Sequence, residues 1–144
     1  MLLSFSMDEM RPMIEAGVAE KHGPAGGFGR TKCQTIRKFD GNPRSPYARV
    51  KPGDALHLWW KSRTAARKRL GLIDCLSVSP ITIYSEAPWG KRGVILGDPK
   101  TGPCLSDEAV VALAYADGFT NADAFYEFFV ADAPIAFRGV LIKW

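Results

Sequence analysis

The sequence has little of what metal sites and disulfide frameworks need, with only two histidines and three cysteines in 144 residues. Cys33, Cys75 and Cys104 are odd in number and widely spaced, which favours free thiols in a reducing compartment. These residues and His22 and His57 contain no C-x-x-C or H-x-x-x-H pair. We therefore expect no zinc site and no other cofactor.

Long apolar runs are also missing. No stretch approaches the roughly 20 apolar residues that a membrane span needs. The chain starts with a short apolar segment that reaches Asp8 and Glu9 without a basic region, so we expect no secretory signal peptide, no membrane partner and a cytoplasmic location. The length suits one domain, and neither an internal repeat nor a linker divides residues 1–144.

Acidic residues are scarce in one part of the chain. Residues 30–69 carry twelve basic and two acidic side chains, a net charge of +10, so the remaining residues sum to −6 in a chain of net charge +4. A compact fold with this division can present a positive face to a polyanion, although scattered charges can also simply solvate a surface. Aromatic rings that could stack on unpaired bases are interleaved with the basic residues: Tyr47, His57, Trp59 and Trp60.

Apolar periodicity predicts several short strands and three helices. We expect strands at 33–37, 55–60, 75–84, 93–96 and 136–142, with Pro80 requiring an edge position or a bulge. Helices are predicted over 8–16, stopping at Gly17, and after caps at Ser106 and Thr120. Residues 23–29 are too rich in glycine for a regular element and are predicted to form a surface loop, without the P-loop pattern. This pattern predicts an α+β fold, a small sheet or barrel closed by helices.

The order of the motifs resembles the ASCH domain family of the PUA-like superfamily. The resemblance spans nearly the whole chain and implies a small PUA-like β-barrel flanked by about three helices, with a cleft. The motifs that carry it are, in chain order, an amphipathic segment ending at Gly17, Lys32-x-x-Thr35-x-Arg37, Pro52-Gly53-Asp54, Asp117-Gly118-Phe119 and Phe137-x-Gly139.

The resemblance also implies function. Proteins of this kind are regarded as RNA-binding or RNA-processing modules, and one bacterial branch is a small amidohydrolase that removes the acetyl group from N4-acetylcytidine. The lysine, threonine and glutamate that act in that branch match Lys32, Thr35 and Asp117, and Arg37 matches the arginine that ends the motif. This chain departs from the family in the shorter carboxylate of Asp117 and in the glycine-rich insertion between Gly17 and Lys32.

The residue types admit two chemical interpretations. In the first, a partly buried Lys32 with a cationic neighbour has a lowered pKa and takes a proton from the Thr35 hydroxyl, and Asp117 protonates or orients a leaving amine. In the second, Lys32 and Arg37 contact phosphate or pair with Asp117, and Thr35 is an ordinary strand residue. Both need these residues to meet around one pocket.

A second group of basic residues follows the predicted strand 55–60, which ends in Trp59 and Trp60. The spacing Arg63-x-x-x-Arg67-Lys68-Arg69 predicts a helix or turn with a basic face, which either is a solvated loop or grips a nucleic-acid backbone. Adjacent Trp59 and Trp60 cannot both face inward, so we expect one of them to border the cleft. The candidate nucleic-acid or phosphate contacts are Lys32, Arg37, Lys38, Arg63, Arg67, Lys68, Arg69 and Trp59.

Three hypotheses follow from the sequence. The first is an RNA- or nucleotide-binding module with a basic cleft. The second is an amidohydrolase acting on modified nucleosides such as N4-acetylcytidine. The third is a protein-interaction domain, and the sequence leaves the oligomeric state open.

Overall fold

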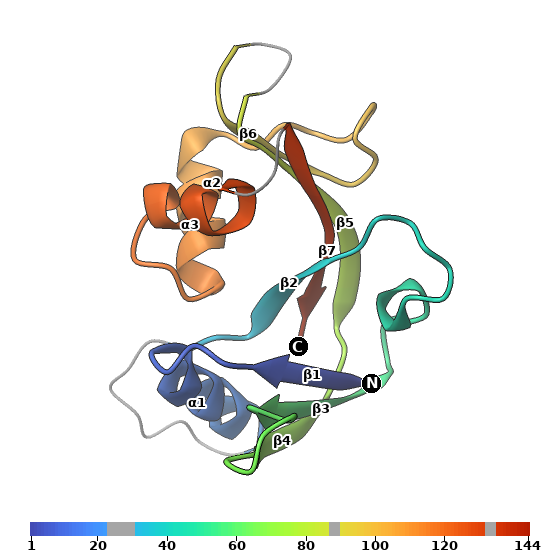
Figure 1. Ribbon diagram of the computed structural model, residues 1–144, viewed down its shortest axis with the longest axis vertical. Helices are drawn as coiled ribbons and strands as arrows, with labels where there is room; N and C mark the ends of the chain where they lie inside the picture. Colours follow the sequence, from blue (N-terminus) through green and yellow to red (C-terminus); the bar gives the residue numbers. More distant parts are fainter. Residues whose placement is uncertain (23–30, 87–89, 132–134) are drawn as a thin grey trace.

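The computed structural model describes residues 1–22, 31–86, 90–131 and 135–144, which form an α+β fold (Figure 1). Its elements, in chain order, are β1 (Leu2–Phe5), α1 (Met10–His22), β2 (Gln34–Lys38), a 3₁₀ helix (Pro46–Ala48), β3 (Ala55–Trp60), β4 (Lys68–Asp74), β5 (Ser77–Tyr84), β6 (Gly93–Leu96), α2 (Asp107–Ala116), α3 (Ala122–Val130) and β7 (Ala136–Lys143). The predicted glycine-rich loop, 23–29, lies outside the described residues.

The strands form two sheets. One has the order β1-β3-β4, with β1 parallel to β3, and the other has the antiparallel order β2-β7-β5-β6. The short turn from β4 to β5 joins the sheets at one corner, where Leu76 N–H donates to the Lys143 carbonyl at 2.8 Å. On the other side, β1 and β2 are sheet edges with no ladder between them in the described part of the chain. The sheets therefore do not close into a barrel.

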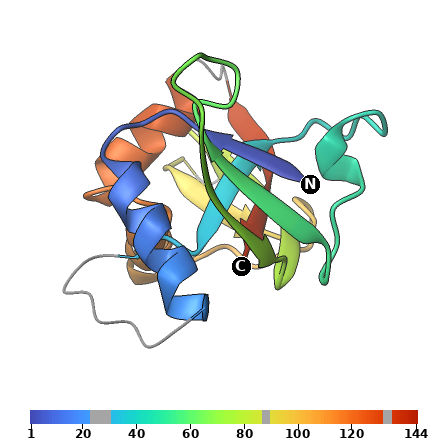
Figure 2. The same cartoon turned by 90° about the horizontal axis from the view of Figure 1, so that it is seen from below.

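The core lies between the sheets and the helices. In β3, Leu56, Leu58 and Trp60 are buried while Ala55 and His57 are exposed, which is the alternation expected of a strand with one solvent-facing side. Helix α3 contacts β5 and β7, and α1 contacts β4, as both views show (Figures 1 and 2). Gly71 permits the second contact, because a Cβ there would lie 2.7 Å from Cγ1 of Val18.

The predicted strands 55–60 and 93–96 are confirmed to the residue as β3 and β6, and those at 33–37, 75–84 and 136–142 are confirmed with ends shifted by up to two residues. Pro80 lies in β5, which is not an edge strand, but its pairing with β6 starts only at Ile81. Its missing N–H therefore faces a position beyond the end of β6, so the strand tolerates proline.

Two expectations about the elements were wrong, two strands were missed, and one basic run is a turn only in part. Helix α1 continues through Gly17 to His22, because the residues after Gly17 are compatible with a helix and glycine is tolerated inside one. The cap of α3 is Asn121, whose side chain accepts from Ala124 N–H at 2.8 Å, and not Thr120. Strands β1 and β4 were not predicted. Lys68 and Arg69 begin β4, so the basic run 63–69 forms a turn and the start of a strand.

No helix in the described ranges has both the length and the apolar character to cross a membrane.

Candidate functional site

A pocket of about 90 Å³ opens beside β1, β2 and α3, and we call it the central pocket. Lys32, Thr35, Arg37 and Asp117 all line it, although 85 residues separate Lys32 from Asp117 in the chain. Its other lining residues are Ser4, Phe5, Ser6, Met7, Met10, Ile36, Phe119, Phe128 and Phe129. The pocket thus has a polar, charged wall next to an apolar, largely aromatic one.

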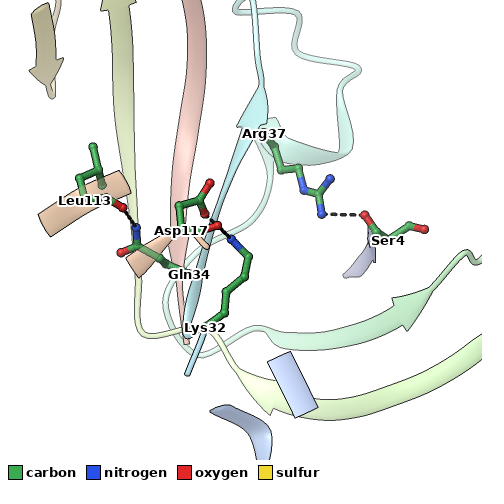
Figure 3. Close-up of polar contacts among 6 residues, drawn as sticks. All are labelled: Ser4, Lys32, Gln34, Arg37, Leu113 and Asp117. Carbon is green, nitrogen blue, oxygen red and sulfur yellow. Dashed lines mark hydrogen bonds and ion pairs between the residues drawn. The ribbon is translucent and has the colours of Figure 1, made fainter. Parts of the chain in front are cut away.

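Lys32 and Asp117 form a buried ion pair at the polar wall (Figure 3). The Lys32 Nζ atom lies 2.6 Å from Asp117 Oδ1, and it also donates to the main-chain carbonyl of Asp117. Only 1% of Lys32 and 3% of Asp117 are exposed. Such a pair is stable only while both partners are present, because either charge alone would be buried without compensation.

The end of helix α2 fixes Asp117 in place. Asp117 is the C-cap residue, and Gly118 follows it with a positive φ of 102°, which glycine adopts readily. The amide of Phe119 donates to the Ala114 carbonyl at 2.9 Å and that of Gly118 to the Tyr115 carbonyl at 3.1 Å, a Schellman motif. The Asp-Gly-Phe motif is therefore a helix terminus, where the Lys32 ammonium also interacts favourably with the helix dipole.

Strand β2 is tied to the same helix by Gln34. Its side-chain amide donates to the Leu113 carbonyl at 3.3 Å (Figure 3). The backbone amide of Asp117 donates to the same carbonyl at 2.9 Å. Gln34 is buried, and it holds the carboxylate-bearing end of α2 at a fixed distance from β2.

The backbone of Lys32 is anchored against α1. Its amide donates to the Met13 carbonyl at 2.9 Å, and a Cβ at Gly17 would lie 2.5 Å from the Lys32 carbonyl oxygen. Gly17 therefore permits close approach of the segment that carries Lys32, a role different from the helix stop that the sequence predicted.

Arg37 bridges the open side between the two sheets. Its Nη2 donates to the Ser4 carbonyl of β1 at 2.7 Å (Figure 3), and its guanidinium lies over the Phe5 ring with Cζ 4.8 Å from the ring centroid. The Nε atom is buried and has no hydrogen-bond partner among the described residues. Burial lowers the pKa of Arg37, against the opposing influence of Tyr47 and Asp117, but a guanidinium keeps its charge in proteins.

Burial raises the pKa of Asp117 above its ordinary range. The charge of Lys32 is the largest opposing influence, and Arg37 and the backbone amide of Ile36 also favour the ionised carboxylate. Burial therefore disfavours the ionised carboxylate, and the neighbouring positive charges act against that effect.

The other predicted contact residues do not line the central pocket. Lys38, Arg63, Arg67, Lys68 and Arg69 are exposed, and Lys68 Nζ lies 3.0 Å from Glu15 Oε1. Trp60 faces the core, and Trp59 is half-buried without bordering this pocket.

Residues 61–69, which we call the basic hairpin, nevertheless contact a strand that the pocket shares. Ser62 N–H donates to Ser4 Oγ at 3.2 Å, and Lys61 N–H donates to the Phe5 carbonyl at 2.8 Å. Ser4 and Phe5 both line the pocket. Strand β1 therefore contacts both the basic hairpin and the central pocket.

Sequence reasoning missed the apolar wall. Ser4 and Phe5 were missed because β1 was not predicted, and Met10 lies in a predicted helix that nothing in the sequence placed beside the site. Phe128 carried a signal, because it falls outside the apolar stripe of α3 that contains Phe125 and Phe129.

No family model, curated protein or solved structure matches the chain significantly. Within the described ranges, no group of three or more histidine, cysteine or acidic residues could hold a metal ion. The function must therefore be argued from the residues themselves.

Proposed function

We propose that this protein binds RNA or a nucleotide, with one nucleotide at the central pocket and neighbouring phosphates on the basic hairpin. The observation that carries the proposal is the position of Ser4 and Phe5. Both line the pocket with Lys32 and Arg37, and both are hydrogen-bonded to the hairpin. A ligand chain entering the pocket would therefore pass close to the exposed Arg63, Arg67, Lys68 and Arg69, where phosphates are attracted electrostatically.

We also propose that the fold is an open variant of the PUA-like barrel of the ASCH family. Two sheets share one core, are joined at the β4–β5 corner and face each other across the Arg37–Ser4 contact. The Lys32-x-x-Thr35-x-Arg37 motif and the Asp117-Gly118-Phe119 motif contribute to one pocket, as the resemblance implies.

Removing the charges of the basic hairpin tests the RNA proposal. A variant with Arg63, Arg67, Lys68 and Arg69 changed to glutamine should bind a short single-stranded RNA more than tenfold more weakly at low salt. If all four residues contact phosphates, the slope of log K against log salt should become shallower by about 3, because each contact with a single strand contributes roughly 0.7. Fluorescence anisotropy titrations at several salt concentrations measure both quantities.

The control variant removes four exposed basic side chains elsewhere, at Arg44, Lys51, Lys100 and Lys143. It has the same net charge as the hairpin variant. If the basic hairpin contacts RNA directly, the control variant should lose less affinity for RNA than the hairpin variant. Equal losses in the two variants would show that only net charge matters. Absence of binding by the unmodified protein at low salt would refute RNA binding.

A second candidate function is hydrolysis of an acylated nucleoside, favoured by the presence of Lys32, Thr35 and Asp117 in one buried pocket wall. The proposed reaction requires the proton of the pair to lie on the Asp117 carboxyl group, so that Lys32 accepts the Thr35 hydroxyl proton as Thr35 Oγ attacks the amide carbonyl. The carbon–nitrogen bond breaks as the Asp117 carboxyl group protonates the leaving amine. Water then hydrolyses the acyl-threonine ester, releasing the carboxylic acid and restoring the hydroxyl group.

Substitution of Thr35 tests this mechanism. Thr35→Ala should abolish release of cytidine from N4-acetylcytidine, while Thr35→Ser should retain measurable turnover because it keeps the hydroxyl nucleophile. Chromatography of the nucleosides after incubation measures the reaction. Unchanged substrate with the unmodified protein at high concentration, or equal turnover by Thr35→Ala, would contradict the hydrolase proposal without affecting RNA binding.

A further inference from the structure

Phe128 is an exposed aromatic ring at the central pocket. Its exposed fraction is 56%, whereas Phe129, its neighbour in α3, is 8% exposed. An isolated exposed ring on a surface needs no explanation, but this one lines the same pocket as the buried Lys32–Asp117 pair. It therefore contributes an exposed aromatic side chain to the lining of the pocket.

The ring of Phe128 is held by other aromatic residues. Its centroid lies 5.3 Å from that of Phe119 and 5.0 Å from that of Phe129, and both of these rings are buried. Edge-to-face and tilted contacts of this kind fix a ring by packing. A ring held in this way loses little conformational freedom when a planar ligand stacks on it.

The charges of the polar wall disfavour a phosphate deep in the pocket. Lys32 is already paired with Asp117 at 2.6 Å, which leaves Arg37 as the uncompensated charge of the wall, and the Asp117 carboxylate repels an anion. The adjacent apolar wall offers a phosphate no hydrogen bonds. A neutral ring with a polar edge matches both walls, because it can stack on the aromatic side and turn its polar edge to the Arg37 side.

We propose that Phe128 is the stacking surface for a nucleobase, and that the central pocket takes the base and not the phosphate of a bound nucleotide. The base edge faces the polar wall, and the phosphates remain outside on the basic hairpin. This inference rests on the proposed function and gives its two regions different roles. The basic hairpin supplies salt-dependent affinity for phosphates, and Phe128 distinguishes a ligand that has a base from one that lacks it.

The probes are two ten-nucleotide oligomers at one low salt concentration, a single-stranded RNA containing all four bases and the same ribose–phosphate chain without bases. The unmodified protein should bind the RNA at least tenfold more tightly than the abasic oligomer. Phe128→Leu keeps an apolar side chain but removes the ring face, so it should weaken RNA binding about tenfold and leave abasic binding unchanged. Phe128→Trp should retain the preference for the RNA. Tyr115→Leu is the control, since Tyr115 is 55% exposed on α2 and does not line the pocket.

The outcomes separate the two proposals. Equal binding of both oligomers, or a Phe128→Leu variant that keeps the full preference for the RNA, overturns the stacking role and leaves phosphate binding intact. Equal affinity of Phe128→Leu and Phe128→Trp would show an apolar contact and would likewise overturn stacking. If neither oligomer binds the unmodified protein, the proposed function itself fails.

Discussion

Replacing Lys32 with methionine is expected to lower the free energy of unfolding by about 3–5 kcal/mol, because it leaves the buried Asp117 carboxylate without its partner. The expected loss is large because Lys32 and Asp117 are both almost fully buried and their charged atoms lie 2.6 Å apart. Urea denaturation followed by circular dichroism measures it. A loss below about 1 kcal/mol at neutral pH would contradict this view of the pair.

The double variant Lys32→Met with Asp117→Leu is the matched control. It removes both charges and should regain much of the lost stability, since well-packed apolar residues often replace a buried pair without penalty. A double variant that is as unstable as the single one would show that the helix-end contacts of Lys32, and not the uncompensated charge, dominate.

The loss in the single variant should also depend on pH. Burial raises the pKa of Asp117, and Lys32→Met removes the largest opposing charge. The folded state then binds a proton at a higher pH than the unfolded state, whose carboxyl group has an ordinary pKa near 3.8. The destabilisation is therefore fully present above the folded-state pKa and shrinks as the pH falls through it.

The sequence was most informative where periodicity and local chemistry agree. The alternation of residues 55–60, the short apolar segment 93–96 and the Ser106 cap all follow from patterns within a few residues. The order of the motifs likewise predicts that Lys32, Thr35, Arg37 and Asp117 lie around one pocket. All four line the central pocket.

The missed features depend on contacts between distant segments. Strand β1 is four residues long and pairs in parallel with β3, more than fifty residues away, so no local pattern marks it. Gly17 has the sequence signature of a helix stop, but its role is set by the approach of the Lys32 backbone. The apolar wall of the pocket depends on both β1 and α3, and for this reason the sequence placed Trp59 or Trp60 at the cleft, where the structure has phenylalanine residues of β1 and α3.

Replacing Arg37 with methionine is expected to weaken RNA binding at least tenfold, which corresponds to about 1.4 kcal/mol. Arg37 contributes a positive charge to the pocket wall, and no ion pair to a carboxylate is seen for it among the residues that the structure describes. Arg37→Lys should rescue binding only in part, because an ammonium group lacks the planar fork of donors that reaches Ser4 and the pocket together. Anisotropy titrations with the same single-stranded RNA measure both variants.

Arg92→Met is the control that separates binding from structure. Arg92 also lies over an aromatic ring, with Cζ 4.6 Å from the Tyr126 centroid, and it pairs with Asp123 at 2.6 Å, but it does not line the central pocket. Both substitutions remove one positive charge and one cation–π contact, so their effects on net charge are the same, and urea denaturation of both variants measures how far their effects on packing differ. If Arg92→Met weakens RNA binding as much as Arg37→Met, the affinity comes from overall charge and the central pocket is not the binding site. If only Arg37→Met does so while both variants unfold at similar urea concentrations, the central pocket is part of the binding site.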